Sequence, residues 1–137
     1  MSQPHDASGP PDTAPPPARH NRTLPALSAD LAGVILFTAI GRRNHAEGVS
    51  IAGIADTAWP FLAGTLFGWL VSRGWRRPTA LMPTGVVVWV CTVAVGMALR
   101  KATGEGIALS FVAVASLVTA LLILGWRAVA AGLTRRR

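Results

Sequence analysis

The feature that most constrains this chain is an apolar stretch of sixteen residues, Gly85 to Arg100, with the sequence GVVVWVCTVAVGMALR. Its only charged residue is the last one, so the stretch can cross a lipid bilayer as a helix. At 100° per residue, one narrow stripe of this helix carries Gly85, Trp89, Thr92, Gly96 and Arg100. The glycines let another backbone come close, and the threonine can donate a hydrogen bond. We therefore expect a membrane helix whose stripe faces other helices. The opposite face is wholly apolar: Val87, Val90, Ala94, Met97 and Ala98.

Composition supports a membrane protein, because 51% of the 137 residues are hydrophobic and they fall in long runs. The predicted fold is all-α, a four-helix transmembrane bundle formed by one domain, residues 28–127. The spans are expected at about 28–43, 51–72, 84–100 and 107–126. Residues 1–27 are predicted to be a disordered, proline-rich tail, and residues 128–137 a basic tail.

The basic residues indicate the orientation. The net charge is +7, with 13 basic and 6 acidic residues, and the basic ones cluster at the ends of apolar segments rather than along a nucleic-acid-binding face. Nine fall on the side of the N-terminus: Arg19, Arg22, Arg73, Arg76, Arg77, Arg127, Arg135, Arg136 and Arg137. Four fall on the other side: Arg42, Arg43, Arg100 and Lys101. The positive-inside rule then puts both termini in the cytoplasm. The richness in alanine, glycine, valine and arginine resembles that of a GC-rich bacterial genome, so we expect the plasma membrane of a bacterium.

The first two spans carry features for helix packing. In the first span, Asp30, Phe37, Gly41 and, if the helix continues, His45 share a face. In the second span, Pro60 should kink the helix, and Gly64 and Gly68 form a GxxxG pair that favours close contact with another helix.

The two halves of the sequence are alike, which predicts a parallel repeat of two helical hairpins. Phe61 aligns with Phe111, and Gly74-Trp75-Arg76 aligns with Gly125-Trp126-Arg127. If the repeat exists, spans one and three are equivalent, and so are spans two and four.

A family resemblance rests on residues spread over positions 28 to 127. They are Asp30, Gly41-Arg42, His45, Pro60-Phe61, Gly85, Trp89, Thr92, Gly96, Arg100, Phe111 and Gly125-Trp126-Arg127. This pattern resembles the small prokaryotic membrane proteins called domain of unknown function 3054. The resemblance implies an integral membrane protein of four helices and implies no activity.

Several polar residues lie at the expected outer ends of the helices. Arg42 and Arg100 could hold an anionic group or a lipid headgroup, and His45 could titrate near neutral pH. Asp56 could pair with either arginine. The alternative, which we favour, is ordinary interfacial charge, with arginines reaching toward the headgroups.

Asp30 has two interpretations. It could be a buried acid that pairs with Arg127 or Arg73, and intramembrane acids often mark ion paths. We favour a plain capping role, because Ser28 is a natural N-cap and would place Asp30 in the first helical turn.

No catalytic, cofactor or metal motif stands out, so we expect neither an enzyme nor a metal site. The function that we expect first is a small transporter or channel-like protein for an ion or small solute, with a conduit that would form more readily in a homo-oligomer. The alternative is a non-catalytic accessory or lipid-interacting protein that acts through its charged rims. The lipid bilayer is the expected partner, nucleic acid is not, and the substrate, if there is one, is not identified.

Overall fold

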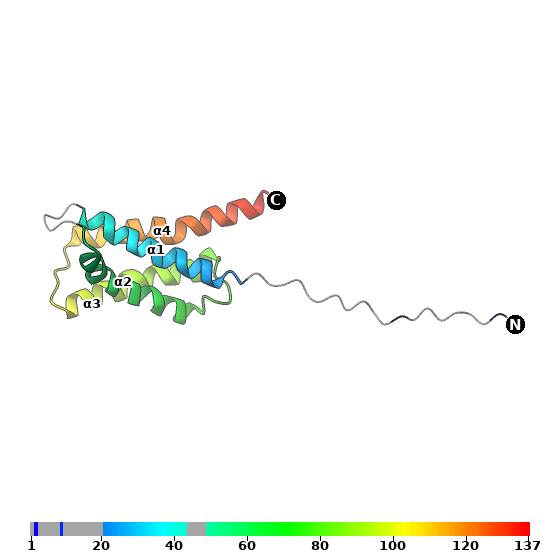
Figure 1. Ribbon diagram of the computed structural model, residues 1–137, viewed down its shortest axis with the longest axis horizontal. Helices are drawn as coiled ribbons and strands as arrows, with labels where there is room; N and C mark the ends of the chain where they lie inside the picture. The colour runs from blue at the N-terminus through cyan, green and yellow to red at the C-terminus, as the bar shows by residue number, and fades with distance from the viewer. Residues whose placement is uncertain (1, 3–8, 10–20, 44–48) are drawn as a thin grey trace.

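The computed structural model describes residues 2, 9, 21–43 and 49–137 of the chain, so His45 and most of the predicted proline-rich tail lie outside the described residues. The described chain forms four packed helices, each long and apolar enough to span a membrane (Figure 1). They are α1 (Thr23–Arg42), α2 (Ile51–Ser72), α3 (Val86–Ala102) and α4 (Leu109–Arg135), with one wide turn, η1 (Leu81–Gly85), leading into α3. The predicted fold class is confirmed.

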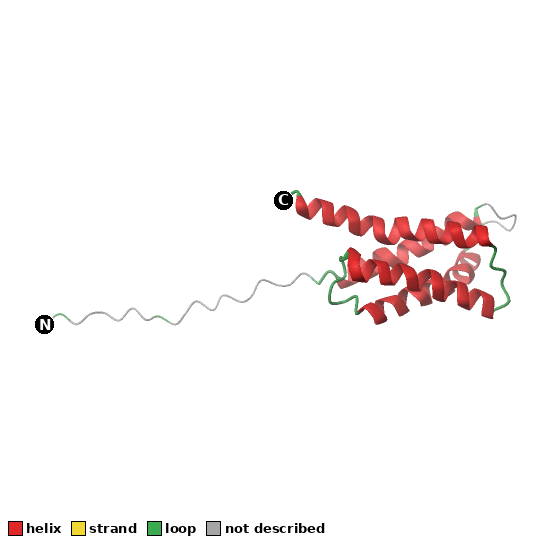
Figure 2. Ribbon diagram, turned by 180° about the vertical axis from the view of Figure 1, so that it is seen from behind, coloured by secondary structure: helices red, strands yellow, loops and turns green. Residues whose placement is uncertain are grey.

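The helices run alternately up and down, as their short connections require (Figures 1 and 2). The start of α1, the connection of residues 73–80 and the end of α4 lie at one end of the bundle, which we call the terminal end. The end of α1, the start of α2 and the connection between α3 and α4 lie at the opposite end, which we call the loop end.

α1 begins at Thr23, about a turn and a half before the expected start at Ser28. The side-chain oxygen of Asn21 accepts a hydrogen bond of 3.2 Å from the Thr23 N–H, and Pro25 fits the first turn, where its missing N–H would have no helical partner. Ser28 therefore lies inside the helix, and its predicted role as N-cap is wrong.

α4 also exceeds its expected end at residue 126 and continues to Arg135. Residues 128–131 are alanine and valine, and nothing in this segment stops a helix before Arg135. The predicted basic tail is thus largely a helical extension that projects past the other helices (Figure 1).

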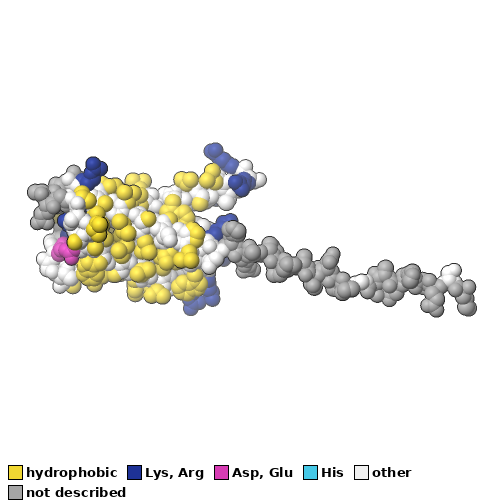
Figure 3. Space-filling view, viewed as in Figure 1, with side chains coloured by type: hydrophobic (Ala, Val, Ile, Leu, Met, Phe, Trp, Pro, Cys, Tyr) yellow, Lys and Arg dark blue, Asp and Glu magenta, His cyan; other side chains and the backbone are white. Residues whose placement is uncertain are grey.

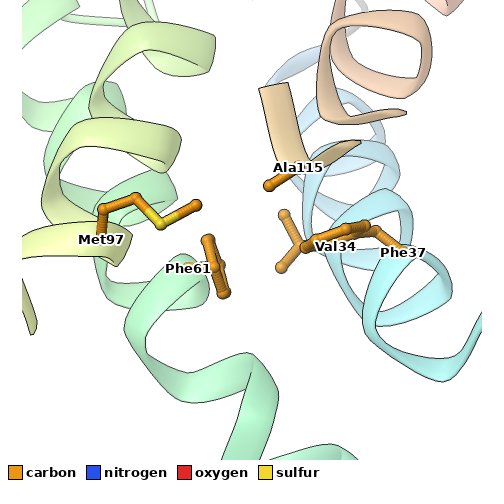
Figure 4. Packing of buried hydrophobic residues seen from close by; sticks show 5 residues of the cluster. All are labelled: Val34, Phe37, Phe61, Met97 and Ala115. Atoms are coloured by element: carbon orange, nitrogen blue, oxygen red, sulfur yellow. The ribbon is translucent and has the colours of Figure 1, made fainter. Parts of the chain in front are cut away.

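A hydrophobic cluster toward the loop end joins all four helices (Figure 4). It consists of Val34, Phe37, Phe61, Met97 and Ala115. The rings of Phe37 and Phe61 meet edge to face, with centroids 5.5 Å apart, a favoured aromatic geometry. Met97, on the apolar face opposite the stripe, is buried beside Phe61, where its flexible thioether chain can adapt to the space available.

Glycines bring α2 and α3 into close contact. A Cβ at Gly64 would lie 2.7 Å from the Cys91 carbonyl oxygen, and one at Gly68 would lie 2.8 Å from the Val88 Cα, so no side chain fits at either position. A Cβ at Gly96 would likewise collide with the Phe61 ring, 2.5 Å away. The GxxxG pair of α2 and the stripe of α3 therefore face each other.

The remaining positions singled out for packing behave differently from one another. α2 continues through Pro60, and in Figure 1 its first turns, in dark green, lie at an angle to the turns that follow. The Trp89 indole N–H donates a 3.0 Å hydrogen bond to the Ser116 carbonyl oxygen of α4. Gly41, by contrast, has no described atom within 4 Å of where its Cβ would be, so its packing role stays a prediction.

The proposed repeat stays a prediction. Phe61 and Phe111 do meet in one aromatic group, with centroids 6.2 Å apart. Arg127, however, is fully buried, whereas its counterpart Arg76 is exposed in a connection.

Candidate functional site

The most distinctive polar group in the bundle is an ion pair between α1 and α4. Arg127 and Asp30 both have 0% exposure. The two terminal nitrogens of the guanidinium donate parallel hydrogen bonds to the two carboxylate oxygens, 2.8 Å to Oδ1 and 2.7 Å to Oδ2. This two-pronged geometry is the strongest that an arginine and a carboxylate can form.

Two tryptophans complete the surroundings of Asp30. The indole N–H of Trp69 on α2 donates to Oδ2, and that of Trp126 on α4 donates to Oδ1, each over 2.9 Å. Each carboxylate oxygen thus accepts two hydrogen bonds. Burying a charge is costly unless the charge is paired and fully hydrogen-bonded. The four hydrogen bonds to its carboxylate therefore explain how Asp30 is tolerated inside the bundle.

Arg127 has further partners of its own. Nη1 also donates to the Ile123 carbonyl oxygen over 2.9 Å, and Nε donates to the Pro78 carbonyl oxygen over 3.2 Å. The guanidinium lies 4.4 Å from the centre of the Trp126 ring. Gly85 makes room for this side chain, because a Cβ there would be 2.9 Å from the Arg127 Cδ. The pair therefore links α1, α2, α4 and the connection before α3.

This arrangement corrects the interpretation of Asp30. The residue lies about two turns inside α1, so the capping role that we favoured is wrong. Of the two candidate partners, Arg127 forms the pair and Arg73 is exposed. All the lone pairs of Asp30 that face the bundle are engaged, so the carboxylate is a structural element in this conformation.

Thr92 lies deeper in the bundle and is also internally bonded. Its hydroxyl shares a 2.8 Å hydrogen bond with the Thr65 hydroxyl of α2, and both residues are 0% exposed. Each hydroxyl oxygen also lies within hydrogen-bond distance of a carbonyl of its own helix, Thr92 of Val88 and Thr65 of Phe61, so the hydroxyl that donates to the other threonine leaves its own carbonyl contact to compete for the same hydrogen. The centre of the α3 stripe is thus buried and bonded within the bundle.

At the loop end, the polar candidates form separate contacts. Arg100 pairs with Glu105 over 3.0 Å, and its guanidinium lies 4.5 Å from the centre of the Phe111 ring. Arg42 donates a 3.1 Å hydrogen bond to the Thr57 hydroxyl. The pairing of Asp56 with either arginine, the less favoured alternative, does not form among the described residues, where Asp56 is exposed and has no ion pair. Arg42 and Arg100 each keep a buried Nε without a described hydrogen-bond partner.

The terminal end is rich in exposed arginines. In the sequence, these residues serve only to predict which end of the bundle faces the cytoplasm. Arg22, Arg73, Arg76 and Arg77 are all exposed there. The first of two open clefts holds about 500 Å³ and lies between the start of α1 and the following connection; it is lined by Asn21, Arg22, Thr23 and residues 75–80. The second holds about 220 Å³ and is lined by Ser72, Arg73, Arg76, Arg77, Pro83 and Thr84.

Figure 3 shows how apolar and basic side chains are distributed on one face of the molecule. Hydrophobic side chains cover the length of the bundle, and the blue side chains of lysine and arginine gather at its two ends. Within residues 21–43 and 49–137, no group of three metal-binding side chains comes together.

The comparison with protein families supplies the identification. Residues 27–130 match the model of the family described as protein of unknown function (DUF3054). The chain belongs to the DUF3054 family. The matched region of this DUF3054 member takes in Asp30, Trp69, Trp126 and Arg127, and so the entire buried network. No curated protein and no solved structure matches the chain.

Proposed function

We propose that this DUF3054 protein is a non-catalytic membrane protein that acts through its charged rims on anionic lipid. The observation that carries the proposal is the contrast between interior and rim. The interior ionic groups, Asp30 and Arg127, are bonded to one another, whereas the arginines of the terminal end are exposed beside open clefts. The described acids other than Asp30 are Asp56 and Glu105, at the loop end.

The packing of the interior supports this role over transport. A transporter needs polar groups along a continuous wet route. Here Thr92 is buried against Thr65, and Gly64, Gly68 and Gly96 are closed by neighbouring atoms. The transport hypothesis then requires a conduit between copies in a homo-oligomer, and the rim hypothesis requires no conduit.

Orientation follows from the same charges. We propose that the terminal end faces the cytoplasm of a bacterial cell, with both chain ends on that side. Besides the four arginines beside the clefts, Arg135, Arg136 and Arg137 end the α4 extension there. The cytoplasmic leaflet is rich in anionic lipid and attracts such clusters. An Arg76→Cys variant tests this orientation. Labelling of its thiol by a membrane-impermeant reagent from the cytoplasmic side only would support the proposal.

Reconstitution distinguishes lipid interaction from transport. The purified protein would be placed in vesicles of phosphatidylcholine with and without phosphatidylglycerol, and both ion flux and retained lipid would be measured. We expect selective retention of phosphatidylglycerol and no flux above that of empty vesicles. Flux that disappears in Asp30→Asn or Arg100→Gln, while the protein stays folded, would instead establish transport and overturn the proposal.

A further inference from the structure

We infer that the larger cleft at the terminal end holds the phosphate of an anionic phospholipid headgroup, and that the Asp30–Arg127 pair positions the connection that forms it. This inference rests on the proposed function and names its site. The cleft lies between the start of α1 and residues 75–80 and has a volume of about 500 Å³. That volume exceeds what a single phosphate group needs and leaves room for the glycerol that carries it.

The lining has the chemistry of a phosphodiester site. Arg22 comes from one wall, and Arg76 and Arg77 come from the other. Guanidinium groups are suited to phosphate because their N–H donors match its oxygens in pairs. None of the described residues that line the cleft is acidic, so none of them repels an anion.

Neutral groups in the lining suit the rest of a headgroup. Thr23 and Thr79 supply hydroxyls, and Asn21 supplies an amide that can bond to glycerol oxygens. The Trp75 side chain is 50% exposed at the same place. Tryptophan is enriched at the depth of the headgroups, which is where a lipid phosphate lies.

The second cleft shares two of these arginines. Arg76 and Arg77 line both clefts, whereas Arg22 lines only the larger one and Arg73 only the smaller one. Replacing Arg76 and Arg77 together therefore removes cations from both clefts, and replacing Arg22 alone tests the larger cleft by itself.

The backbone of the connection is anchored on both sides. The Thr23 hydroxyl of α1 donates to the Trp75 carbonyl oxygen over 3.4 Å. The Arg127 Nε donates to the Pro78 carbonyl oxygen over 3.2 Å while its two terminal nitrogens bind Asp30. Arg127 is thus a positioning residue: it ties the segment that carries Arg76 and Arg77 to the buried pair.

The first test uses the full chain in detergent micelles, titrated with phosphatidylglycerol, with phosphatidylcholine and with inorganic phosphate. Bound lipid is counted by native mass spectrometry. We expect phosphatidylglycerol to bind in preference to phosphatidylcholine, and Arg76→Gln/Arg77→Gln to weaken that binding by roughly tenfold or more. The matched control, Arg43→Gln/Lys101→Gln, removes the same charge from exposed positions at the loop end and should bind as the unchanged protein does.

The other outcomes separate the site from the wider proposal. If phosphatidylglycerol binds equally to both double variants and is lost only in Arg135→Gln/Arg136→Gln/Arg137→Gln, the cleft is the wrong site and lipid binding stands. If the unchanged protein shows no preference for phosphatidylglycerol, both the site and the proposed function fail. If inorganic phosphate alone competes fully at millimolar concentration, the cleft binds free phosphate and the lipid assignment is overturned.

The second test addresses positioning. Arg127→Lys keeps the charge but cannot pair in two prongs with Asp30 and also reach Pro78. We expect folded Arg127→Lys protein to lose several-fold in phosphatidylglycerol affinity, together with faster proteolysis at Arg76 and Arg77. Unchanged affinity in folded Arg127→Lys protein would overturn the positioning role. The Phe111→Leu variant, which perturbs the loop end, controls for a general loss of stability.

Discussion

The guanidinium of Arg127 and the carboxylate of Asp30, 97 positions apart in the sequence, face each other in two parallel hydrogen bonds inside the bundle. The pair joins the first helix to the last and is covered by the indoles of Trp69 and Trp126. Helices in a membrane gain little from the hydrophobic effect between them, so such a bonded polar group can decide which helices become neighbours.

Breaking this pair on one side should destabilise the protein strongly. Asp30→Ala leaves a buried guanidinium without its counter-charge, at a cost of about 3–5 kcal/mol by analogy with soluble proteins. Replacing both partners in Asp30→Leu/Arg127→Met should cost clearly less than Asp30→Ala alone. Reversible unfolding in mixed micelles measures both. Equal losses in the single and double variants would contradict the account of Asp30 as a fully engaged partner.

The seam between α2 and α3 should tolerate no side chain at Gly64. Gly64→Val would place atoms against the Cys91 carbonyl, 2.7 Å from the expected Cβ, and force the helices apart. We expect a loss of about 1–3 kcal/mol, as for overpacking elsewhere. Gly41→Val is the matched control, since no described atom lies within 4 Å of where the Gly41 Cβ would be, and this variant should unfold close to the unchanged protein. Similar losses of stability in both variants would show that the effect of valine comes from its helix propensity rather than from packing against α3.

The hydroxyl pair of Thr65 and Thr92 should contribute modestly. In a double-mutant cycle with Thr65→Val and Thr92→Val, we expect a coupling of about 0.6 kcal/mol, the average for hydrogen bonds between membrane helices. Each threonine also bonds to its own helix, which limits what the contact adds. A coupling energy of zero would mean that the two hydroxyls do not interact in the membrane, contrary to the structure.

The contacts of Arg100 at the loop end should contribute more to stability through the Phe111 ring than through the ion pair with Glu105. Glu105→Gln removes a partner whose side chain is 48% exposed, so we expect a change below about 1 kcal/mol. Phe111→Ala removes a half-buried ring that packs against the core cluster and lies beneath Arg100, and should cost about 2–3 kcal/mol, less than a fully buried ring. Thermal unfolding of the two variants compares them, and a larger loss in Glu105→Gln would reverse this order.

Much of the architecture could be predicted from the sequence, because a bilayer permits few alternatives. Four long apolar runs indicate four helices, and the spacing of Gly85, Thr92 and Gly96 identifies the packed face of α3. The GxxxG pair of Gly64 and Gly68 is a weak motif by itself, and its importance here comes from facing α3.

The buried network could be predicted only in part. The sequence indicates Asp30 and Arg127 as possible partners, but an expected helix start at Ser28 favours a capping role for Asp30, and the observed start at Thr23 moves Asp30 into the helix. The role of Trp69 was missed, since its direction depends on how α2 is rotated in the bundle. Its place near the same end of the membrane as Trp126 is the one signal that could have suggested it.

The terminal clefts were missed for a related reason. In the sequence, Arg73, Arg76 and Arg77 look like a charge cluster that sets topology. Only the folded arrangement brings Arg76 and Arg77 beside Arg22, because the Thr23 contact to Trp75 depends on where α1 begins.

The most direct test of the central claim, a closed interior with function at the rim, is a comparison of two single cysteines in a Cys91→Ala background. Thr92→Cys lies at the buried centre of the α3 stripe, and Arg76→Cys lies in the basic connection. Both proteins, in native membrane vesicles of either orientation, would be treated with a charged, impermeant thiol reagent. We expect rapid labelling at position 76 from one side only and none at position 92 from either side. Labelling at position 92 would reveal an aqueous route through the bundle and contradict the account.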